Sequence, residues 1–356
     1  MRAFAAGEVI FDFGQTGREM FLVLEGNVVI TLHGAEIDRL GPGDLMGEMA
    51  LVEDRPRSAR ATAETNCKLL RIGHEEFSQL VQASPDFALQ VMSAMSGRLR
   101  RFIDEEVRRQ RLEEELRIGR EIQLSLIPDA CPNLGGWEFA ATYQPARQVG
   151  GDFYDFIFAE NNHDEMQMVI ADVTGKGVPA ALFMASCRTT IRAESVRGEG
   201  PGETLSRANC VIALDTRYPL FITAFCARLH AGSGSVTFAN GGHERPFWLK
   251  ASSGSCQVLE SHDPLLGFAK DVQYEEYSIT VEIGDFLVFF TDGVTEARNA
   301  QGHFYGDERL QRTIEARAWA SAQALLEGIL ASVEEFSGDS PAADDLTLVV
   351  ARRLAV

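Results

Sequence analysis

The sequence predicts an α+β protein with an N-terminal β jelly-roll, a helical linker and a C-terminal α/β sandwich of antiparallel sheets flanked by helices. Three observations lead to this prediction. Residues 1–72 contain short β-patterned runs separated by glycines. Residues 75–127 place apolar side chains at helical spacing and become dense in Arg and Glu. Residues 135–356 alternate strand-like and helix-like runs, and strands predominate.

Length and composition limit the classes of protein to which the chain can belong. Its 356 residues correspond to two or three domains, which we expect over 1–97, over a coiled-coil-like linker at 98–128 and over 129–356. The formal net charge of −19 argues against a nucleic-acid partner, because phosphate neutralisation needs clustered Lys and Arg. No apolar run is long enough to span a bilayer. We therefore expect a cytoplasmic protein without membrane insertion, whose six scattered cysteines are reduced.

The N-terminal region is predicted to form a small β-barrel, because many short strands joined by glycine turns are typical of jelly-rolls. The strand candidates are Val9–Phe11, Met20–Leu24 and Val28–Leu32. The loop 41–59 then combines glycines, acids and arginines within one short stretch. In such a loop Glu48 can accept a hydrogen bond from a sugar hydroxyl, and Arg57 can clamp a phosphate.

Residues 4–100 resemble a cyclic-nucleotide-binding domain, and this loop resembles its phosphate-binding cassette. The resemblance implies that Glu48 binds the ribose 2′-hydroxyl and that Arg57 binds the cyclic phosphate, with Ser58 and Gly47 in the same cassette. The expected regulatory ligand is cAMP or cGMP, and a barrel that keeps the fold without the ligand is the alternative. The sequence lacks the family's usual N-terminal helical segment, which indicates a late start codon or a lost element.

A long helix is expected after the barrel. Apolar residues at helical spacing continue from Phe77 and are interrupted near Pro85. The run from Arg100 to Arg120 is dense in Arg and Glu and carries a thin apolar seam, which is typical of a coiled-coil connector. This seam favours a homodimer through the helix, and a single solvated helix is the alternative. Pro128 is expected to end the helix.

Residues 135–356 are predicted to form antiparallel sheets, because many successive strands are close enough for hairpins. The strand candidates are Glu138–Tyr143, Phe153–Phe158, Gln167–Ala171, Thr223–Leu229, Ser235–Asn240, Pro246–Leu249, Tyr274–Val281, Phe286–Thr291 and Leu346–Ala351. The helix candidates are Pro179–Val196, Gly202–Thr216, Asp307–Ala316 and Ala322–Phe336.

One stretch of this region combines the features of a ligand site. The apolar run 168–171 ends on Asp172, and two glycines follow before Pro179 opens a helix. Gly175 and Gly177 allow a tight turn and a close approach of the backbone to a ligand. Asp172 is therefore expected where a strand ends beside a helix N-terminus, a place that can hold a metal ion or a phosphate.

Four clusters of acids recur at the predicted strand ends. They are Asp152 with Asp155, Asp172, Asp292, and Asp344 with Asp345. Carboxylates that converge repel one another unless cations compensate their charge. Oxygen ligands without His or Cys suit Mg²⁺ or Mn²⁺. Two such ions can share a bridging aspartate and bind a hydroxide for in-line attack on phosphorus.

The residues around these acids resemble the motifs of the SpoIIE/RsbU branch of metal-dependent PPM-type Ser/Thr phosphatases. The matching segments are 150–155, 171–179, 240–246, 291–297 and 344–347. They occur in the family's order, and residues 112–128 resemble the lead-in that precedes the family's catalytic domain. The third segment departs from the family at Gly241 and Arg245. We interpret its His243 as structural rather than as a donor to phosphate.

The resemblance implies roles for the acids. Asp172 bridges two metal ions, and the carbonyl oxygen of Val173 binds one of them. Asp292 and Asp344 complete one metal site, and Asp152 serves the other, directly or through water.

Two further acids are included in the expected metal set. Asp155 supports Asp152, and Asp345 is an additional candidate ligand. The expected catalytic residues are Asp172, Asp292 and Asp344.

The two resemblances together imply a signalling phosphatase that hydrolyses phosphoserine or phosphothreonine on a protein with two Mn²⁺ or Mg²⁺ ions, under cyclic-nucleotide control. The implied substrate is a STAS-type anti-sigma-factor antagonist of a bacterial partner-switching pathway. A metal-bound water is the default proton donor to the leaving group. One alternative is a cyclic-nucleotide-binding scaffold with an inactive phosphatase domain, which the complete acid set argues against. The other is a cyclic-nucleotide-dependent transcription factor, which would need a helix-turn-helix with a basic face.

Overall fold

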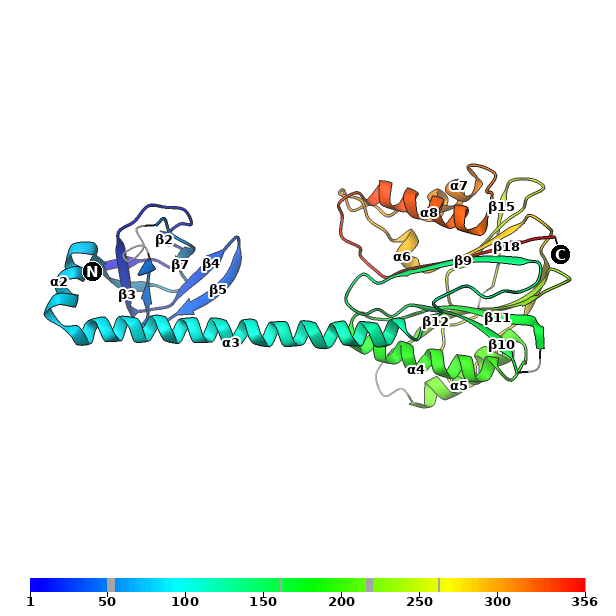
Figure 1. Ribbon diagram of the computed structural model, residues 1–356, viewed down its shortest axis with the longest axis horizontal. Helices are drawn as coiled ribbons and strands as arrows, with labels where there is room; N and C mark the ends of the chain where they lie inside the picture. The colour runs from blue at the N-terminus through cyan, green and yellow to red at the C-terminus, as the bar shows by residue number, and fades with distance from the viewer. Residues whose placement is uncertain (50–54, 161, 216–219, 262, 356) are drawn as a thin grey trace. The chain divides into compact units, whose positions relative to one another are not determined.

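A computed structural model describes residues 1–49, 55–160, 162–215, 220–261 and 263–355 (Figure 1). The chain divides into two units, Met1–Leu112 and Glu113–Val356, and each has its own apolar core. Within the described ranges, no helix has the length and apolar character needed to cross a bilayer.

The N-terminal unit contains two four-stranded antiparallel sheets, ordered β1-β8-β3-β6 and β2-β7-β4-β5. Their strands are β1 (Arg2–Phe4), β2 (Val9–Phe11), β3 (Glu19–Glu25), β4 (Val28–Leu32), β5 (Ala35–Leu40), β6 (Leu45–Met46), β7 (Arg60–Ala63) and β8 (Cys67–Gly73). Phe11 and Phe21 belong to their shared core, with ring centroids 6.2 Å apart. This arrangement confirms the predicted β-rich N-terminal domain. The middle of the expected cassette loop, residues 50–54, lies outside the described residues.

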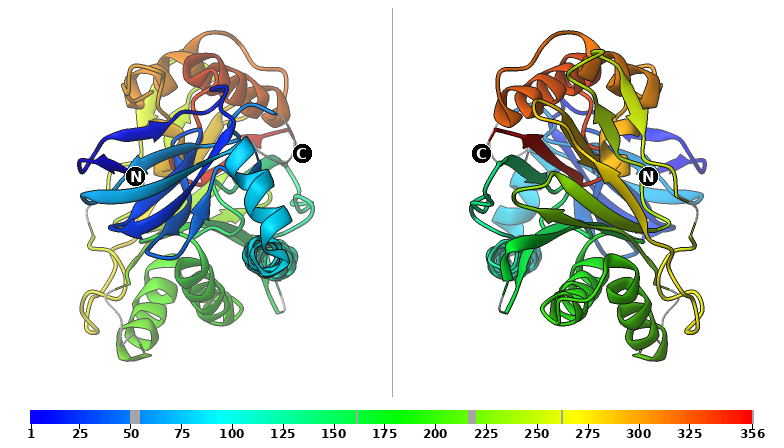
Figure 2. Two further views of the ribbon diagram at one scale, coloured as in Figure 1. Left: turned by 90° about the vertical axis from the view of Figure 1, so that its left-hand side faces the viewer. Right: turned by 90° about the vertical axis from the view of Figure 1, so that its right-hand side faces the viewer.

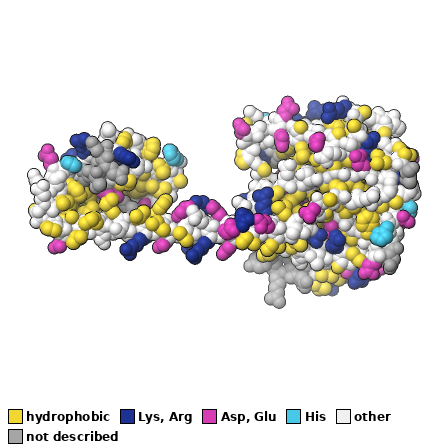
Figure 3. All heavy atoms as spheres, viewed as in Figure 1, with side chains coloured by type: hydrophobic (Ala, Val, Ile, Leu, Met, Phe, Trp, Pro, Cys, Tyr) yellow, Lys and Arg dark blue, Asp and Glu magenta, His cyan; other side chains and the backbone are white. Residues whose placement is uncertain are grey.

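Two helices follow these sheets, α2 (His74–Ala83) and α3 (Pro85–Leu124). Ser84 between them is extended, with φ −141° and ψ 96°, because a following proline disfavours the helical conformation. α3 is 40 residues long, so it begins well before the linker expected at 98, and it ends before Pro128. Basic and acidic side chains are interspersed along it (Figure 3). The boundary between the two units falls inside this helix.

The C-terminal unit contains two five-stranded antiparallel sheets, ordered β10-β11-β12-β13-β16 and β15-β14-β17-β18-β9. The strands of the first are β10 (Phe153–Ala159), β11 (Asn162–Val173), β12 (Ile222–His230), β13 (Ser235–Gly241) and β16 (Tyr277–Thr280). Those of the second are β15 (Cys256–Val258), β14 (Phe247–Leu249), β17 (Phe286–Phe290), β18 (Leu346–Arg353) and β9 (Trp137–Gln144). All of the pairings are antiparallel, as predicted.

Helices cover the outer face of each sheet of this unit (Figure 2). α4 (Val178–Ser195) and α5 (Pro201–Asp215) pack on the first sheet, and α7 (Asp307–Glu315) and α8 (Ala322–Ser337) pack on the second. A single turn, α6 (Asp292–Thr295), follows β17. The inner faces of the sheets meet in a common core, in which the rings of Phe225 and Phe289 lie 5.6 Å apart. Because the strands are covered on both faces, β17 is buried at every position, which explains its unbroken apolar sequence.

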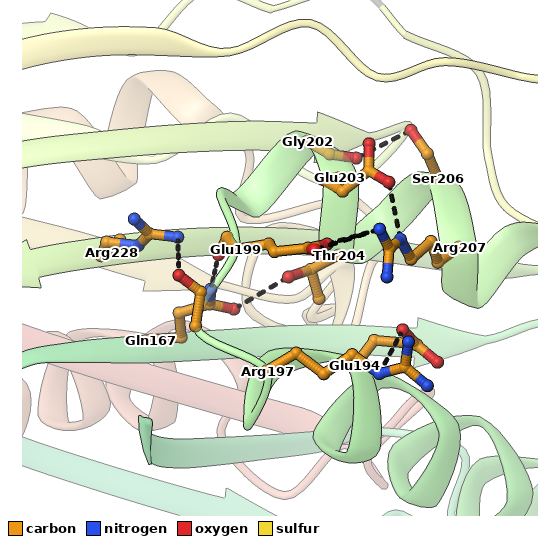
Figure 4. A network of polar contacts seen from close by, with 11 residues as sticks. Gln167, Glu194, Arg197, Glu199, Gly202, Glu203, Thr204, Ser206, Arg207 and Arg228 are labelled. Carbon is orange, nitrogen blue, oxygen red and sulfur yellow. Dashed lines mark hydrogen bonds and ion pairs between the residues drawn. The ribbon is translucent and has the colours of Figure 1, made fainter. Parts of the chain in front are cut away.

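The polar side chain of Gln167 in β11 is buried in this unit. Its Nε2 donates to the carbonyl oxygen of Glu199 at 2.7 Å, and its Oε1 accepts from the Thr204 hydroxyl at 3.3 Å (Figure 4). A cavity of about 450 Å³ lies beside it, and Arg228 on its wall donates to the Gly198 carbonyl at 3.2 Å. The cavity is at the opposite end of β11 from the predicted acids, and these contacts tie the α4–α5 connection to the sheet.

Candidate functional site

Antiparallel pairing brings the predicted acids to one edge of each sheet, where edge means the row of strand ends on one side of the sheet rather than an outermost strand. β10 pairs with β11 so that the start of one strand lies beside the end of the other, which places Asp152 next to Asp172. β17 and β18 pair in the same way, which places Asp292 next to Asp344 and Asp345. The two edges then face each other across the sandwich.

Asp152 connects the two sheets. Its carboxylate is buried, and its Oδ2 accepts hydrogen bonds from Thr291 Oγ1 and Thr347 Oγ1, both at 2.7 Å. Both threonines belong to the edge of the second sheet, whereas Asp152 precedes the first strand of the other sheet. Burial, and next the charge of Asp172, raises the pKa of Asp152 well above its usual range.

Asp172 and Asp292 face other carboxylates with too little positive charge around them. Burial, followed by the charge of Asp292, raises the pKa of Asp172 to about 7. Burial, followed by the charge of Asp344, raises the pKa of Asp292 to about 6. Buried like charges favour the protonated forms of these acids unless a cation compensates them. The group is therefore arranged to attract a cation.

Lys176 supplies one such positive charge. Its Nζ lies 2.6 Å from Asp344 Oδ2 and donates to the carbonyl oxygen of Ala343 at 2.6 Å. The loop that carries it passes through Gly175 and Gly177, whose φ angles of 98° and 76° are accessible to glycine at little cost. The two glycines thus allow the turn that directs Lys176 to the acid.

Asp345 accepts hydrogen bonds from two backbone amides. Its Oδ1 accepts from the N–H of Ala146 at 2.8 Å, and its Oδ2 accepts from the N–H of Gly151 at 2.6 Å. Gly151 is also packed against the predicted carbonyl ligand, since a Cβ there would lie 2.8 Å from the Val173 oxygen. In this structure Asp345 holds the loop before β10, and its role as an additional metal ligand stays a prediction.

Asp155 is placed apart from the other acids. Its buried carboxylate forms ion pairs with Arg188 at 3.0 Å and with Arg192 at 2.6 Å, both on α4. Two arginines pair with its carboxylate, so Asp155 attaches α4 to the sheet in this structure. Its inclusion in the metal set, in support of Asp152, stays a prediction.

The predicted nucleotide site is centred on Arg57. Its buried guanidinium lies over the ring of Phe11, with 4.3 Å between Cζ and the ring centroid, and its Nη1 donates to the Gly47 carbonyl at 3.0 Å. A Cβ at Gly47 would lie 2.3 Å from Nη1, and one at Gly17 would lie 2.8 Å from Nη2. Both glycines therefore make room for the guanidinium.

Burial lowers the pKa of Arg57, and the charges of Glu19 and Glu48 act in the opposite direction. Glu48 is itself buried, so the structure brings Gly47, Glu48 and Arg57 together. Ser58 is exposed, and its Oγ lies 3.8 Å from the Met49 sulfur.

Two family models match the chain. That of the cyclic nucleotide-binding domain matches residues 1–84, and that of Stage II sporulation protein E (SpoIIE) matches residues 162–354. The chain is 32% identical over 244 residues to phosphoserine phosphatase RsbU of Bacillus subtilis (strain 168), which is 68% of this chain and 71% of RsbU. The chain belongs to the SpoIIE family. These findings confirm the predicted fusion of a cyclic-nucleotide-binding domain with a SpoIIE/RsbU-type phosphatase domain.

Two further similarities concern the separate units of this SpoIIE-family protein. The SiaA-PP2C domain of Pseudomonas aeruginosa superposes with a TM-score of 0.61 at 21% identity, over 69% of this chain and 98% of that domain. This similarity shows a PP2C-type fold. The cyclic nucleotide-gated potassium channel mll3241 of Mesorhizobium japonicum is 43% identical over 88 residues, which are 24% of each chain.

The acids of the SpoIIE-family site have the chemistry that a divalent metal ion needs: Asp152 is buried, Asp172 and Asp292 are half-buried, and the pKa values of all three are raised. In the part of the chain that the structure describes, no three His, Cys, Asp or Glu side chains already surround one point as ligands do. In this structure Lys176 pairs with Asp344, and two threonine hydroxyls donate to Asp152. These carboxylates fit a divalent metal ion, and in this structure Lys176 pairs with Asp344 Oδ2.

His243 is structural, in agreement with the interpretation of the sequence. It is buried, its Nδ1 lies 2.8 Å from the Thr223 hydroxyl, and its N–H donates to Asn240 Oδ1 at 2.7 Å. Burial lowers the pKa of His243 to about 3, so the ring is neutral near pH 7. A neutral, enclosed imidazole of this kind shapes the wall of the site.

The sequence analysis gave no role to four residues that the structure places at the site. They are Lys176, Thr291, Thr347 and Gln123. Both threonines flank acids at strand ends, and Lys176 lies between the two glycines after Asp172. These positions within the motifs could have identified all three residues as part of the site. Gln123 lies in the lead-in segment, and only its contacts reveal its function.

Proposed function

We propose that this protein hydrolyses phosphoserine or phosphothreonine on a protein substrate and that a cyclic nucleotide, cAMP or cGMP, regulates it. The observation that supports the catalytic part is the convergence of Asp152, Asp172, Asp292 and Asp344 at facing sheet edges, with raised pKa values for the first three. Acids that destabilise one another in this way are typical of functional sites rather than of fold-stabilising contacts.

Asp172, Asp292, Asp344 and the Val173 carbonyl would hold two Mn²⁺ or Mg²⁺ ions, with Asp152 serving one of them. Bound there, these ions supply an activated water and positive charge for the phosphoryl oxygens. The protein contributes position: the two threonines fix Asp152, and Gly151 keeps the backbone close to Val173. Asp344 is released to a ligand role when Lys176 moves away.

The proposed substrate is the phosphorylated form of a STAS-type anti-sigma-factor antagonist. Similarity to a protein named phosphoserine phosphatase supports the phosphoserine class. The STAS assignment rests on the resemblance to the SpoIIE/RsbU branch.

The proposed regulatory ligand is supported by the cradle around Arg57. A buried guanidinium between Gly17 and Gly47, with Glu48 nearby, offers one clamp for a phosphate and one acceptor for a hydroxyl. A similar sequence occurs in a channel named for cyclic nucleotide gating.

We also propose a homodimer through α3. Leu99, Phe102, Val107, Leu112 and Ile122 are exposed along this helix, with Phe102 65% exposed. Burying such a seam against a second copy removes apolar surface from water. Phe102→Asp should shift the protein from dimer to monomer in sedimentation velocity. Arg101→Asp, which adds the same group at a neighbouring exposed position outside the seam, should not, and a wild-type monomer at all concentrations would reject the dimer.

One experiment tests the main proposal. The purified full chain is incubated with a phosphorylated STAS protein, with and without Mn²⁺ and with each cyclic nucleotide. We expect phosphate release only with the metal and a changed rate with one nucleotide. Nucleotide binding without any phosphate release would favour the scaffold with an inactive phosphatase domain. A transcription factor is disfavoured, because a 40-residue mixed-charge helix and antiparallel sheets follow the barrel.

A further inference from the structure

We propose that Gln123 is a positioning residue for the metal site, which it serves by holding the backbone of Gly150 at two points. This inference rests on the proposed metal-dependent phosphatase activity. Gln123 lies in the last turn of α3, and its side chain is buried. Its Nε2 donates to the Gly150 carbonyl at 2.5 Å, and its Oε1 accepts from the Gly150 N–H at 3.1 Å.

A primary amide is matched to this task. It offers a donor and an acceptor side by side, so it pairs with both the C=O and the N–H of one residue, as a residue of a neighbouring antiparallel strand would. A glutamate of the same shape keeps the acceptor and loses the donor, and a methionine of similar length keeps neither. Because the pair is buried, a lost partner leaves a backbone group unsatisfied rather than solvated.

The segment that Gln123 holds has no room to shift. A Cβ at Gly150 would lie 2.0 Å from Asp345 Oδ2 and 2.3 Å from the Tyr143 hydroxyl oxygen. That hydroxyl is buried, without a hydrogen-bond partner among the described residues. Asp345 meanwhile accepts from the N–H of Gly151. Gly150 is thus enclosed between the helix on one side and the edge of the second sheet on the other.

A displacement at this point reaches the proposed ligand directly, because Asp152 follows Gly150 by two residues. Its carboxylate is fixed at its far end by Thr291 and Thr347, so it cannot follow a displaced backbone without losing those bonds. The end of α3 and the position of Asp152 are therefore coupled within the C-terminal unit. Any signal that shifts or rotates the last turn of this helix changes the metal site.

The alternative is that Gln123 only stabilises the fold, and the experiment separates the two. The variants are Gln123→Met and Gln123→Glu in the full chain. The control is Ser125→Ala, which removes a bond from the same helix end to the Ile122 carbonyl without touching the loop. Mn²⁺ affinity is measured by calorimetry, thermal stability by circular dichroism, and amide exchange at Gly150 and Gly151 by mass spectrometry.

We expect Gln123→Met to weaken Mn²⁺ binding about 10-fold, the effect typical of losing a group that orients a metal ligand. Exchange at Gly150 and Gly151 should increase, and nearly full turnover should return at saturating Mn²⁺. Gln123→Glu keeps the shape and should show the same direction of change even if Gln123→Met folds poorly. Ser125→Ala should match the wild type.

Wild-type Mn²⁺ affinity in both folded variants would overturn the proposal, and a lowered melting temperature alone would then assign Gln123 to stability. If the wild-type protein itself binds no Mn²⁺, the proposed function fails. Exchange at Gly150 and Gly151 is measured without metal, so it would still test whether Gln123 holds this backbone. Unchanged exchange in both variants would reject that role.

Discussion

Lys176 Nζ lies 2.6 Å from Asp344 Oδ2, so a side-chain cation stands beside a carboxylate that we assign to a metal ion. The pair is partly exposed, with 40% of the lysine side chain and 30% of the aspartate side chain accessible. Such pairs contribute no more than about 1 kcal/mol, and a divalent ion can displace a monovalent ammonium from them. Lys176 therefore compensates the charge of Asp344 in the metal-free protein, and we expect it to compete with a metal ion.

Replacing this lysine should strengthen metal binding. We expect Lys176→Met to raise Mn²⁺ affinity by about fivefold, which corresponds to ~1 kcal/mol, and to lower the stability of the metal-free protein. Calorimetric titration with Mn²⁺ measures the first effect. Lys270→Met, a change at an exposed lysine of the same unit, should alter neither quantity. Weaker Mn²⁺ binding in Lys176→Met would show that the lysine assists the metal instead.

Turnover should require both a divalent ion and Asp172. Asp172→Asn removes the charge at the centre of the acid group, and we expect phosphate release to fall at least ~10³-fold, comparable to the loss of a central charge-stabilising group. EDTA should abolish activity, and Mn²⁺ or Mg²⁺ should restore it. Asp271→Asn, an exposed acid of the same unit, serves as the control. Full activity in EDTA would contradict the two-metal assignment.

His243 predicts a pH-dependent stability. Because its pKa is lowered to about 3 in the folded state and is near 6.5 when unfolded, the unfolded chain binds more protons between these values. The stability that the neutral ring provides is present above about pH 6.5 and is lost as the pH falls. His243→Asn should reduce the slope of stability against pH between 5 and 6 by up to about 1.4 kcal/mol per pH unit. Urea unfolding of both proteins in EDTA measures the difference, and equal slopes would refute the assignment.

Nucleotide affinity should depend on Arg57. Losing a charge-assisted hydrogen bond costs about 1.5–3 kcal/mol, so Arg57→Ala should weaken cAMP or cGMP binding at least ~10-fold in calorimetry. Gly47→Ala should act in the same direction, because its Cβ would lie 2.3 Å from Nη1. Arg60→Ala, which removes an exposed arginine paired with Asp12 at 3.3 Å, is the matched control. Absence of heat with either nucleotide in the wild type would favour a domain that keeps the fold without the ligand.

Nucleotide control should require a continuous α3. Two glycines inserted after Glu114 break the helix, since each disfavours helix by about 1 kcal/mol. We expect nucleotide binding and basal phosphatase activity to persist and nucleotide control to disappear. The same insertion after Gly254, in an exposed turn, should leave control intact. If control survives the first insertion, the signal does not travel through this helix.

The fold could be predicted from the sequence wherever strands are long and covered on both faces. β17 and β18 are almost entirely buried, so their apolar runs identified them within two residues of their ends. β15 was missed because it has only three residues, too few for its alternation of apolar and polar side chains to be recognised as a strand. The interruption expected near Pro85 separates α2 from α3, whereas the apolar spacing gave no sign that the first turns of α3 continue directly into the linker expected at 98.

The acids of the site could be found from the sequence, but their separate functions could not. Asp155 and Asp345 look like ligands because Asp155 lies three residues after Asp152 and Asp345 directly follows Asp344. Their actual partners are distant in the chain: Arg192 is 37 residues from Asp155, and Ala146 is 199 residues from Asp345. Only the pairing of the strands and the packing of α4 bring these groups together, and no local pattern records that.

The two hydroxyls that hold Asp152 also constrain how this sequence can change over evolution. Thr291 and Thr347 are 56 residues apart, and each donates to the same carboxylate oxygen. A relative that loses one hydroxyl leaves the buried acid with half of its donors, whereas one that loses the acid leaves two buried hydroxyls without an acceptor. The three positions should therefore co-vary among homologous sequences, so that chains lacking one of these residues lack the others as well.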